Sequence, residues 1–95
     1  MNTNLIKLTF AKDVTRLAGY PYGEHIFVEQ VKGKIDYSEN ATLIFPEHIE
    51  KIASSFVQGF FSEIKEKIGL QGIEDRFTLN TSSENLANSI MQNLR

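Results

Sequence analysis

The pattern of apolar and polar positions is clearest between Thr42 and Gly69. An apolar run over 41–45 ends at Pro46 and predicts a buried strand that other elements cover on both faces. Beyond two adjacent serines, Ser54 and Ser55, apolar residues recur at i, i+4 and i+8 on two neighbouring rows. These residues are Phe56, Val57, Phe60, Phe61, Ile64 and Ile68. The stretch therefore predicts a strand, a connecting loop and a central helix that begins at the two serines.

Two further segments have the period of a strand, and a third repeats the pattern of the central helix. Residues 4–10 alternate between apolar and polar side chains and predict a strand exposed on one side, and residues 73–80 form an alternating segment of strand length. Thr81 and Glu84 then fit a capping box at the start of a helix. The apolar residues that follow predict a terminal helix, and they are Leu86, Ala87, Ile90, Met91 and Leu94.

One segment between the first two predicted strands is open to two interpretations. Gly19, Pro21 and Gly23 predict a turn that cannot be regular helix. Residues 24–32 then place apolar side chains one helical turn apart, with Gly33 as a plausible stop. The same residues are rich in Ile, Phe and Val, which also favour strands. Residues 24–32 are therefore either a helix or an extended segment.

The order of the elements predicts the fold class. Strands and helices alternate with short links, so each helix supplies the crossover that a parallel pair of strands needs. We expect one α/β domain over residues 1–95, with a small, partly parallel sheet and about three helices packed on it. No internal repeat or low-complexity tract divides the chain.

Composition removes several classes of function. The 95 residues include no cysteine, which excludes disulfides, thiolate metal sites and thiol nucleophiles. The formal net charge of -2 provides no clustered positive charge for nucleic acid or for an anionic membrane surface. No apolar run approaches the roughly 20 residues of a membrane span, and the first residues lack the pattern of a signal peptide. We therefore expect a cytoplasmic protein that binds neither nucleic acid nor membrane.

The start of the central helix is the first candidate site. Free backbone N–H groups and the positive end of the helix dipole favour an oxygen or an anion there. Ser55 and Gln58 fit a capping box, which makes the serine a structural cap. Ser55 is also a candidate phosphoacceptor, because a phosphate at a helix start gains from the same donors and adds about two negative charges to a contact surface. Gly59 costs up to roughly 1 kcal/mol relative to alanine, so either a close approach explains it or the cost is tolerated.

A glycine-rich loop in the first third of the chain is the second candidate site. Arg16 with Gly19, Tyr20, Tyr22 and Gly23 combines a tight turn with a guanidinium and two phenols, which suit an anion or an aromatic ligand. The loop matches neither the Walker pattern nor the G-x-G-x-x-G fingerprint. In the alternative interpretation, the two tyrosines only cover the edge of the core.

The sequence offers no catalytic constellation. His25 and His48 are the two histidines, and neither has the spacing of a metal site such as H-E-x-x-H. The aspartates are scattered, and the G-x-S-x-G element of a serine hydrolase is absent. We expect both histidines at surface or half-buried positions, and we expect no catalytic residue, no metal and no cofactor.

Two stretches resemble a known family. At IFPEHIEKIASSFVQGFFSEI the chain resembles the STAS-like domains, relatives of the sulphate-transporter and anti-sigma-factor-antagonist (STAS) family. In that family a buried strand leads through a short link into a Ser-Ser or Asp-Ser-x-Gly element that opens a helix. The earlier TRLAGYPYGEHIF looks like the Arg-x-x-Gly-Pro-x-Ser-Gly-Glu-x-Phe stretch of a small STAS-like subgroup. The resemblance implies a STAS-like α/β fold.

The resemblance also implies a function of a bacterial type. In the anti-sigma-factor antagonists, the serine at this helix start is phosphorylated by a partner that is both anti-sigma factor and ATP-dependent kinase, and phosphorylation breaks the complex. Ser55 resembles that phosphoacceptor, whereas Ala53 stands where the antagonists carry aspartate and Phe56 where they often carry glycine. The implied protein is a non-enzymatic regulatory module that binds a protein partner, such as a histidine-kinase-like ATPase. The implied contact residues are Ser54, Ser55, Phe56, Gln58 and Gly59.

The residues themselves leave a second class of function open. A small-ligand, anion or nucleotide-binding domain would use the loop from Arg16 to Gly23 together with Ser54 and Ser55. The sequence does not distinguish the two classes, and it leaves the oligomeric state open.

Overall fold

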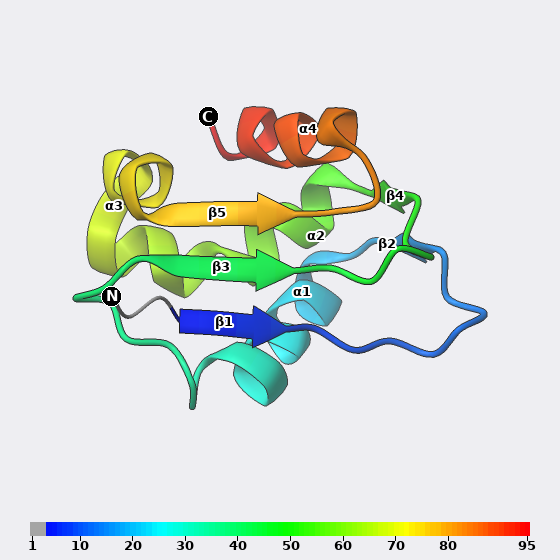
Figure 1. Cartoon of the computed structure of the whole chain (residues 1–95), viewed down its shortest axis with the longest axis horizontal. Coiled ribbons are helices and arrows are strands. Elements are labelled where there is room, and N and C mark those ends of the chain that lie inside the picture. Colours follow the sequence, from blue (N-terminus) through cyan, green and yellow to red (C-terminus); the bar gives the residue numbers. More distant parts are fainter. Residues whose placement is uncertain (1–3) are drawn as a thin grey trace.

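A computed structural model of the chain describes residues 4–95 and shows a mixed α/β fold (Figure 1). The elements follow in the order β1 (Asn4–Lys7), β2 (Arg16–Leu17), α1 (Tyr20–Ile26), a π-helical turn η1 (Phe27–Val31), β3 (Ala41–Ile44), β4 (Lys51–Ile52), α2 (Ser54–Phe60), α3 (Ser62–Arg76), β5 (Phe77–Asn80) and α4 (Glu84–Leu94). The α/β class expected from the sequence is confirmed.

All paired strands in the described part of the chain are parallel. β1, β3 and β5 form a three-stranded sheet in that order, with Ile6 opposite Leu43 and Leu43 opposite Leu79. β2 and β4 form a separate two-stranded sheet. Each pair is joined through at least one helix, because parallel neighbours need a long crossover. The prediction of a partly parallel sheet is therefore confirmed, and both sheets are parallel throughout.

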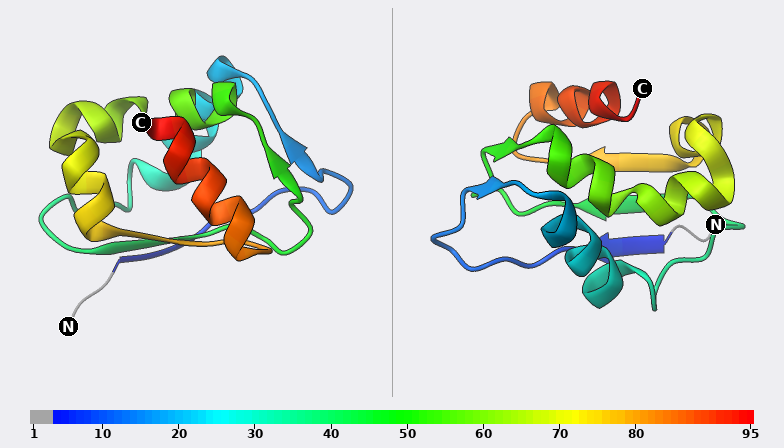
Figure 2. Two further views of the ribbon diagram at one scale, coloured as in Figure 1. Left: turned by 90° about the horizontal axis from the view of Figure 1, so that it is seen from above. Right: turned by 180° about the vertical axis from the view of Figure 1, so that it is seen from behind.

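The helices lie on one side of the three-stranded sheet (Figure 2, left). On that side Leu43 is fully buried, while Thr42 and Ile44, on the other face of the same strand, are only half-buried. The expectation that residues 41–45 are covered on both faces is therefore wrong. The sequence could not reveal this, because Ile44 and Thr42 suit an open strand surface as well as a buried one.

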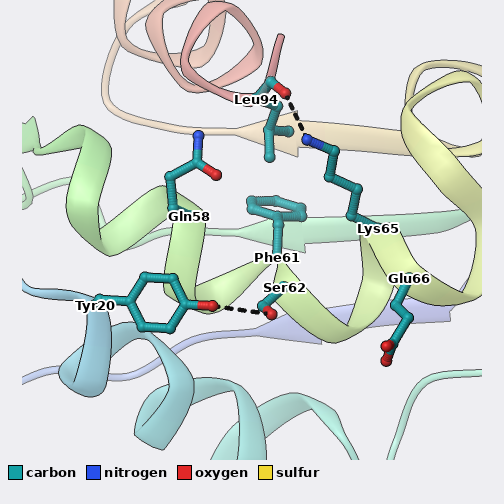
Figure 3. A pocket seen from close by; sticks show the side chains of 7 residues that line it. All are labelled: Tyr20, Gln58, Phe61, Ser62, Lys65, Glu66 and Leu94. Atoms are coloured by element: carbon teal, nitrogen blue, oxygen red, sulfur yellow. Dashed lines mark hydrogen bonds between the residues drawn. The ribbon is translucent and has the colours of Figure 1, made fainter.

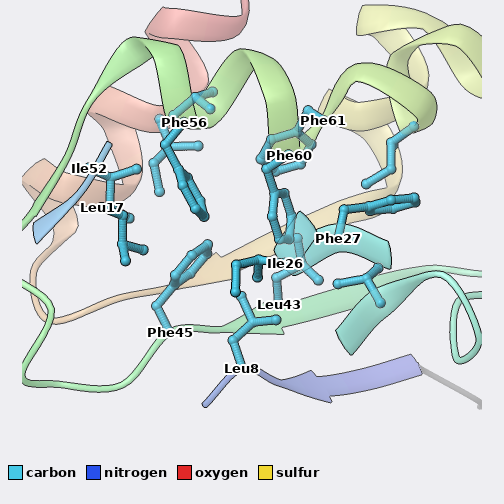
Figure 4. Close-up of a cluster of buried hydrophobic side chains, with 14 of the residues drawn as sticks. Leu8, Leu17, Ile26, Phe27, Leu43, Phe45, Ile52, Phe56, Phe60 and Phe61 are labelled. Atoms are coloured by element: carbon cyan, nitrogen blue, oxygen red, sulfur yellow. The ribbon is translucent and has the colours of Figure 1, made fainter. Parts of the chain in front are cut away.

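Phe60 on α2 is the centre of the hydrophobic core (Figure 4). Its ring centroid lies 5.0 Å from Phe61, 5.7 Å from Phe56, 6.0 Å from Phe27 and 6.1 Å from Phe45. Aromatic pairs at these separations contribute roughly 0.5–1.5 kcal/mol beyond the area they bury. The apolar rows read from the central stretch therefore form the contact between the helical layer and the sheet.

The central helix is broken twice. At Phe61 (φ -93°, ψ 5°) α2 ends and α3 begins, and at Gly69 (φ 73°, ψ 171°) α3 itself bends. A positive φ is a conformation that glycine adopts without a steric penalty. The helix resumes after Gly69 and continues to Arg76, so the strand expected over 73–80 begins only at Phe77.

Helical structure begins earlier in the first third of the chain than the sequence indicated. α1 starts at Tyr20, directly after Gly19 (φ 102°), and Pro21 stands in its first turn, where the missing N–H costs nothing. Gly23 lies inside this helix rather than in a turn. Residues 24–31 are helical, because η1 continues α1 to Val31, and a turn follows at Lys32. The segment is therefore a helix and not an extended segment.

Both predicted capping boxes are wrong. The N-cap of α2 is Ala53, whose methyl group cannot cap the helix, and the Ser55 hydroxyl accepts a hydrogen bond from the Gly19 N–H instead. The N-cap of α4 is Ser83, two residues after Thr81, and its side chain accepts a 3.2 Å hydrogen bond from the Leu86 N–H. The buried stripe expected for the terminal helix is confirmed by Leu86, Ile90 and Leu94.

The Gln30 side chain hydrogen-bonds the chain after β1 as the backbone of a neighbouring strand would. The Gln30 side chain accepts a 2.7 Å hydrogen bond from the Thr9 N–H and donates a 2.9 Å bond to the Thr9 carbonyl. These bonds satisfy the N–H and carbonyl groups of Thr9, which the edge of a sheet would otherwise leave unpaired. Within residues 4–95, no helix is long and apolar enough to cross a membrane.

Candidate functional site

Helices α1 and α2 pack so closely that their contact has no room for a Cβ atom at two glycines. A Cβ on Gly59 would overlap the Tyr20 carbonyl oxygen, and a Cβ on Gly23 would lie 2.7 Å from the Phe60 nitrogen. Real Cβ atoms do not approach backbone atoms so closely. Gly59 is therefore explained by a close approach, as one of the two interpretations of the sequence required, and the neighbour is α1.

The two candidate sites of the sequence meet where α1 and α2 begin. The Gly19 N–H donates a 2.9 Å hydrogen bond to the Ser55 hydroxyl, across 36 positions of sequence. This bond joins the loop before α1 to the first turn of α2. Both chain segments arrive from parallel strands, since β2 leads into α1 and β4 leads into α2. We call the exposed residues Tyr20, Tyr22, Ser54, Ser55 and Gln58 the helix-start surface.

Both tyrosines are tied to the second helical segment by specific contacts. The Tyr22 ring lies 5.6 Å from the Phe56 ring, and the Tyr20 hydroxyl donates a 3.1 Å hydrogen bond to the Ser62 hydroxyl. The two side chains nevertheless remain 43% and 37% exposed for Tyr20 and Tyr22 respectively. They thus cover the edge of the core and also present aromatic surface to solvent.

The residues implied as partner contacts divide into exposed and buried ones. Ser54, Ser55 and Gln58 are exposed, whereas Phe56 and Gly59 are buried and serve the packing of α2. The Gln58 amide does not reach back to the helix start, because it donates to the Asn93 carbonyl on α4. Among these five residues, the exposed serines and Gln58 are the ones that a partner could touch.

Arg16 does not contact the serines, and it stands beside a second cation. It pairs in register with Lys51 across the two-stranded sheet, and both side chains are exposed. Among residues 4–95, neither side chain has a carboxylate partner or a side-chain hydrogen bond. Like charges directly opposite each other destabilise a sheet, so this pair is a local cost to the fold.

A pocket of about 290 Å³ lies next to the helix-start surface (Figure 3). Its lining combines residues of four helices and the break between α2 and α3, namely Tyr20, Gln58, Phe61, Ser62, Lys65, Glu66 and Leu94. Lys65 reaches toward α4, where its Nζ donates a 3.4 Å hydrogen bond to the Leu94 carbonyl. The lining residues Gln58, Lys65 and Glu66 are polar and exposed, which suits a contact with another surface.

The histidines and the perturbed titratable groups belong neither to the helix-start surface nor to the lining of this pocket. His25 is exposed and 3.2 Å from Glu29, and His48 is half-buried with Nε2 3.0 Å from the Ala11 carbonyl, which confirms the expected positions. Hydrogen bonds from Ser38 lower the pKa of Asp36. Within residues 4–95, no three His, Asp or Glu side chains gather as a metal site would require.

Burial raises the pKa of Tyr37, and the nearby charge of Glu63 adds to the effect. The Tyr37 hydroxyl is enclosed and makes no hydrogen bond within residues 4–95. Tyr37 belongs to the connection before β3, so its environment reflects packing of that connection and not the helix-start surface.

Sequence reasoning missed Ser62, Glu66 and Lys51. Ser62 and Glu66 follow Gln58 at i+4 and i+8, and the three line one pocket. That spacing was available in the sequence as the polar side of the helix. What it could not show was that α1 lies against this side. Lys51 gave no signal at all, because its position opposite Arg16 depends on strand register.

Comparison of the chain with family models, with curated proteins and with solved structures gives no match. The resemblance to STAS-like domains therefore rests on the two sequence stretches alone.

Proposed function

We propose that this chain is a non-enzymatic cytoplasmic regulatory module that binds a protein partner through the helix-start surface. The observation that carries the proposal is the hydrogen bond from the Gly19 N–H to the Ser55 hydroxyl, which joins the two candidate segments. The surface presents two partly exposed tyrosines and a serine pair around that bond. Tyrosine is enriched at protein interfaces because one side chain supplies both apolar area and a polar group.

Ser55 suits a switch within this surface. Its hydroxyl is exposed at the second position of α2 and already accepts a backbone N–H. A phosphate on that oxygen would add about two negative charges beside the Gly19 loop and both tyrosines. Partner contacts made by this surface would then have to accommodate a bulky, hydrated dianion. The STAS-like resemblance supports the same residue and a partner that is a histidine-kinase-like ATPase.

The proposal is tested by recovering the tagged full chain from the cells that make it. We expect a partner protein with the unmodified chain and at least a tenfold loss with Ser55→Asp, a change of about 1.4 kcal/mol. The matched control is Ser83→Asp, which also adds a carboxylate at the start of a helix, where aspartate remains a good cap. An equal recovery of partner with Ser55→Asp contradicts the switch, and an equal loss with both variants contradicts the location.

A second candidate function is anion or nucleotide binding beside the same surface. The observation that favours it is the exposed Arg16 and Lys51 pair, whose mutual repulsion an anion would relieve. Isothermal titration with phosphate and nucleotides tests it, with Arg16→Ala and Lys51→Ala as the variants that abolish the heat. Absence of heat with the unmodified chain removes this candidate.

A further inference from the structure

A second hollow continues from the helix-start surface along the line where α1 and η1 meet α2 and α3. It encloses about 200 Å³ and is lined by Glu24, Phe27, Val28, Gly59, Ser62, Glu63 and Glu66. We call it the acidic groove. Ser62 and Glu66 line both hollows, and the hydrogen bond from Tyr20 to Ser62 lies where the two meet.

The groove has an apolar floor and one exposed apolar side chain. Phe27 and Gly59 are buried at its base, where the short distance between the helices keeps the walls together. Val28, on η1, is 58% exposed and among the most exposed large apolar side chains of the described residues. An exposed valine beside a hollow gives a partner side chain an apolar surface to cover.

Only some of the carboxylates on the two walls have a charged partner. Glu24 stands on α1 and Glu63 and Glu66 on α3, so carboxylates line both sides. Glu63 is paired with Lys32, whose Nζ lies 3.4 Å from the carboxylate. Glu24 and Glu66 have no cation or side-chain hydrogen-bond partner among residues 4–95.

The ion pair between Lys32 and Glu63 shows that a cation can bridge the walls of the groove. Lys32 follows η1 on one wall and reaches Glu63 on the other, so an ammonium group already bridges the walls at one point. Lys65 cannot play the same part for Glu66, because it extends toward α4 (Figure 3). Within residues 4–95, no cation pairs with Glu24 or Glu66, so both carboxylates can bind a cation of another molecule.

We propose that the acidic groove binds a basic segment of the protein partner. An arginine or lysine of that segment lies between Glu24 and Glu66, and an apolar residue of the same segment covers Val28. Arginine suits the position best, since a planar guanidinium can donate to two carboxylates at once. This inference rests on the proposed function, and it adds the chemistry of the partner's segment.

The test uses a displayed library of random dodecapeptides selected on the immobilised full chain. We expect enriched peptides to contain arginine or lysine within one helical turn of an apolar residue. Binding of an enriched peptide should fall about tenfold or more in the double variant Glu24→Gln with Glu66→Gln, and it should weaken as salt is added. Both carboxylates lack described partners, so the variant should keep the melting temperature of the unmodified chain.

The matched control removes two other exposed carboxylates, Glu47→Gln with Glu50→Gln, and changes the net charge equally. It should bind the peptide as the unmodified chain does. The inference is overturned by a selection without basic peptides, by no enrichment, by unchanged binding in the groove variant, or by an equal loss in the control. The library is independent of Ser55 and of the natural partner, so its failure leaves the partner-recovery test of the proposed function intact.

Discussion

Replacing Gly59 with alanine tests the close contact between α1 and α2 on which the helix-start surface depends. The added Cβ would overlap the Tyr20 carbonyl oxygen and lie 2.9 Å from the carbonyl carbon. Both atoms belong to the backbone, so no side chain can rotate away to make room. The helices would have to separate, which would also disturb the Tyr20 to Ser62 hydrogen bond.

The size of the effect follows from two opposing contributions. Overpacking a close contact costs typically ~1–3 kcal/mol. Alanine regains up to roughly 1 kcal/mol of helix propensity over glycine. Because the clash at Gly59 is with backbone atoms, we expect the upper part of that range and a net loss of about 2 kcal/mol. For a chain of this size, that loss lowers the melting temperature by about 10 °C.

Thermal unfolding followed by circular dichroism measures this change, with Gly33→Ala as the control. A Cβ on Gly33 meets no atom within 4 Å, and the residue has no positive φ. That variant should be stabilised by ~0.4–1 kcal/mol, because alanine reduces the freedom of the unfolded chain. A Gly59→Ala chain that melts at or above the unmodified chain refutes the close contact.

Three further predictions concern single interactions. Ser83→Ala should cost about 1 kcal/mol in the free energy of unfolding, because it removes the α4 cap on the Leu86 N–H, and urea denaturation measures it. Gln30→Ala should lower stability by about 1 kcal/mol and speed amide exchange at Thr9, where equal exchange would contradict the paired bonds. Tyr37→Phe should raise stability by about 1 kcal/mol at neutral pH, since it removes an enclosed hydroxyl without a described partner. Because burial raises the pKa of Tyr37, its protonated form is favoured by folding, so the unmodified chain should lose stability as the pH rises above about 10 and the phenylalanine variant should lose less.

Periodicity predicted well which side of the central helix and of the last helix is buried. Phe60 and Ile64 lie in the core as their spacing required, and so do Ile90 and Leu94 of the last helix. Periodicity did not reveal the break at Phe61, because Phe61 is buried, and so are Phe60 before the break and Ile64 after it. A pattern of buried positions reports burial and carries no information on whether one helix or two present them.

The capping prediction failed for a reason that lies outside the local sequence. The S-x-x-Q pattern at Ser55 describes a side chain with only its own helix as a partner. In the fold, the Ser55 oxygen accepts a hydrogen bond from the Gly19 N–H, and the Gln58 amide donates to the Asn93 carbonyl on α4. Each competing partner is more than thirty positions away, so no local pattern could include it.

The candidate residues were found, but the contact between them was not. The sequence joined Ser55 and the glycine-rich loop only as an alternative hypothesis of ligand binding, with no physical reason for their proximity. The parallel pairing of β2 with β4 places the two helix starts together, and that pairing spans two residues in each strand. Strand pairs so short leave almost no signal in composition or period.

Site-specific photocrosslinking in the cells that make the protein tests the central claim most directly. A photoreactive phenylalanine analogue is placed at Tyr22 or Ser54 on the helix-start surface, and at Thr78 on the face of the sheet without helices. The account predicts one crosslinked partner protein from both helix-start positions and none from position 78. A partner captured only from position 78, or no crosslink at either helix-start position, would contradict it.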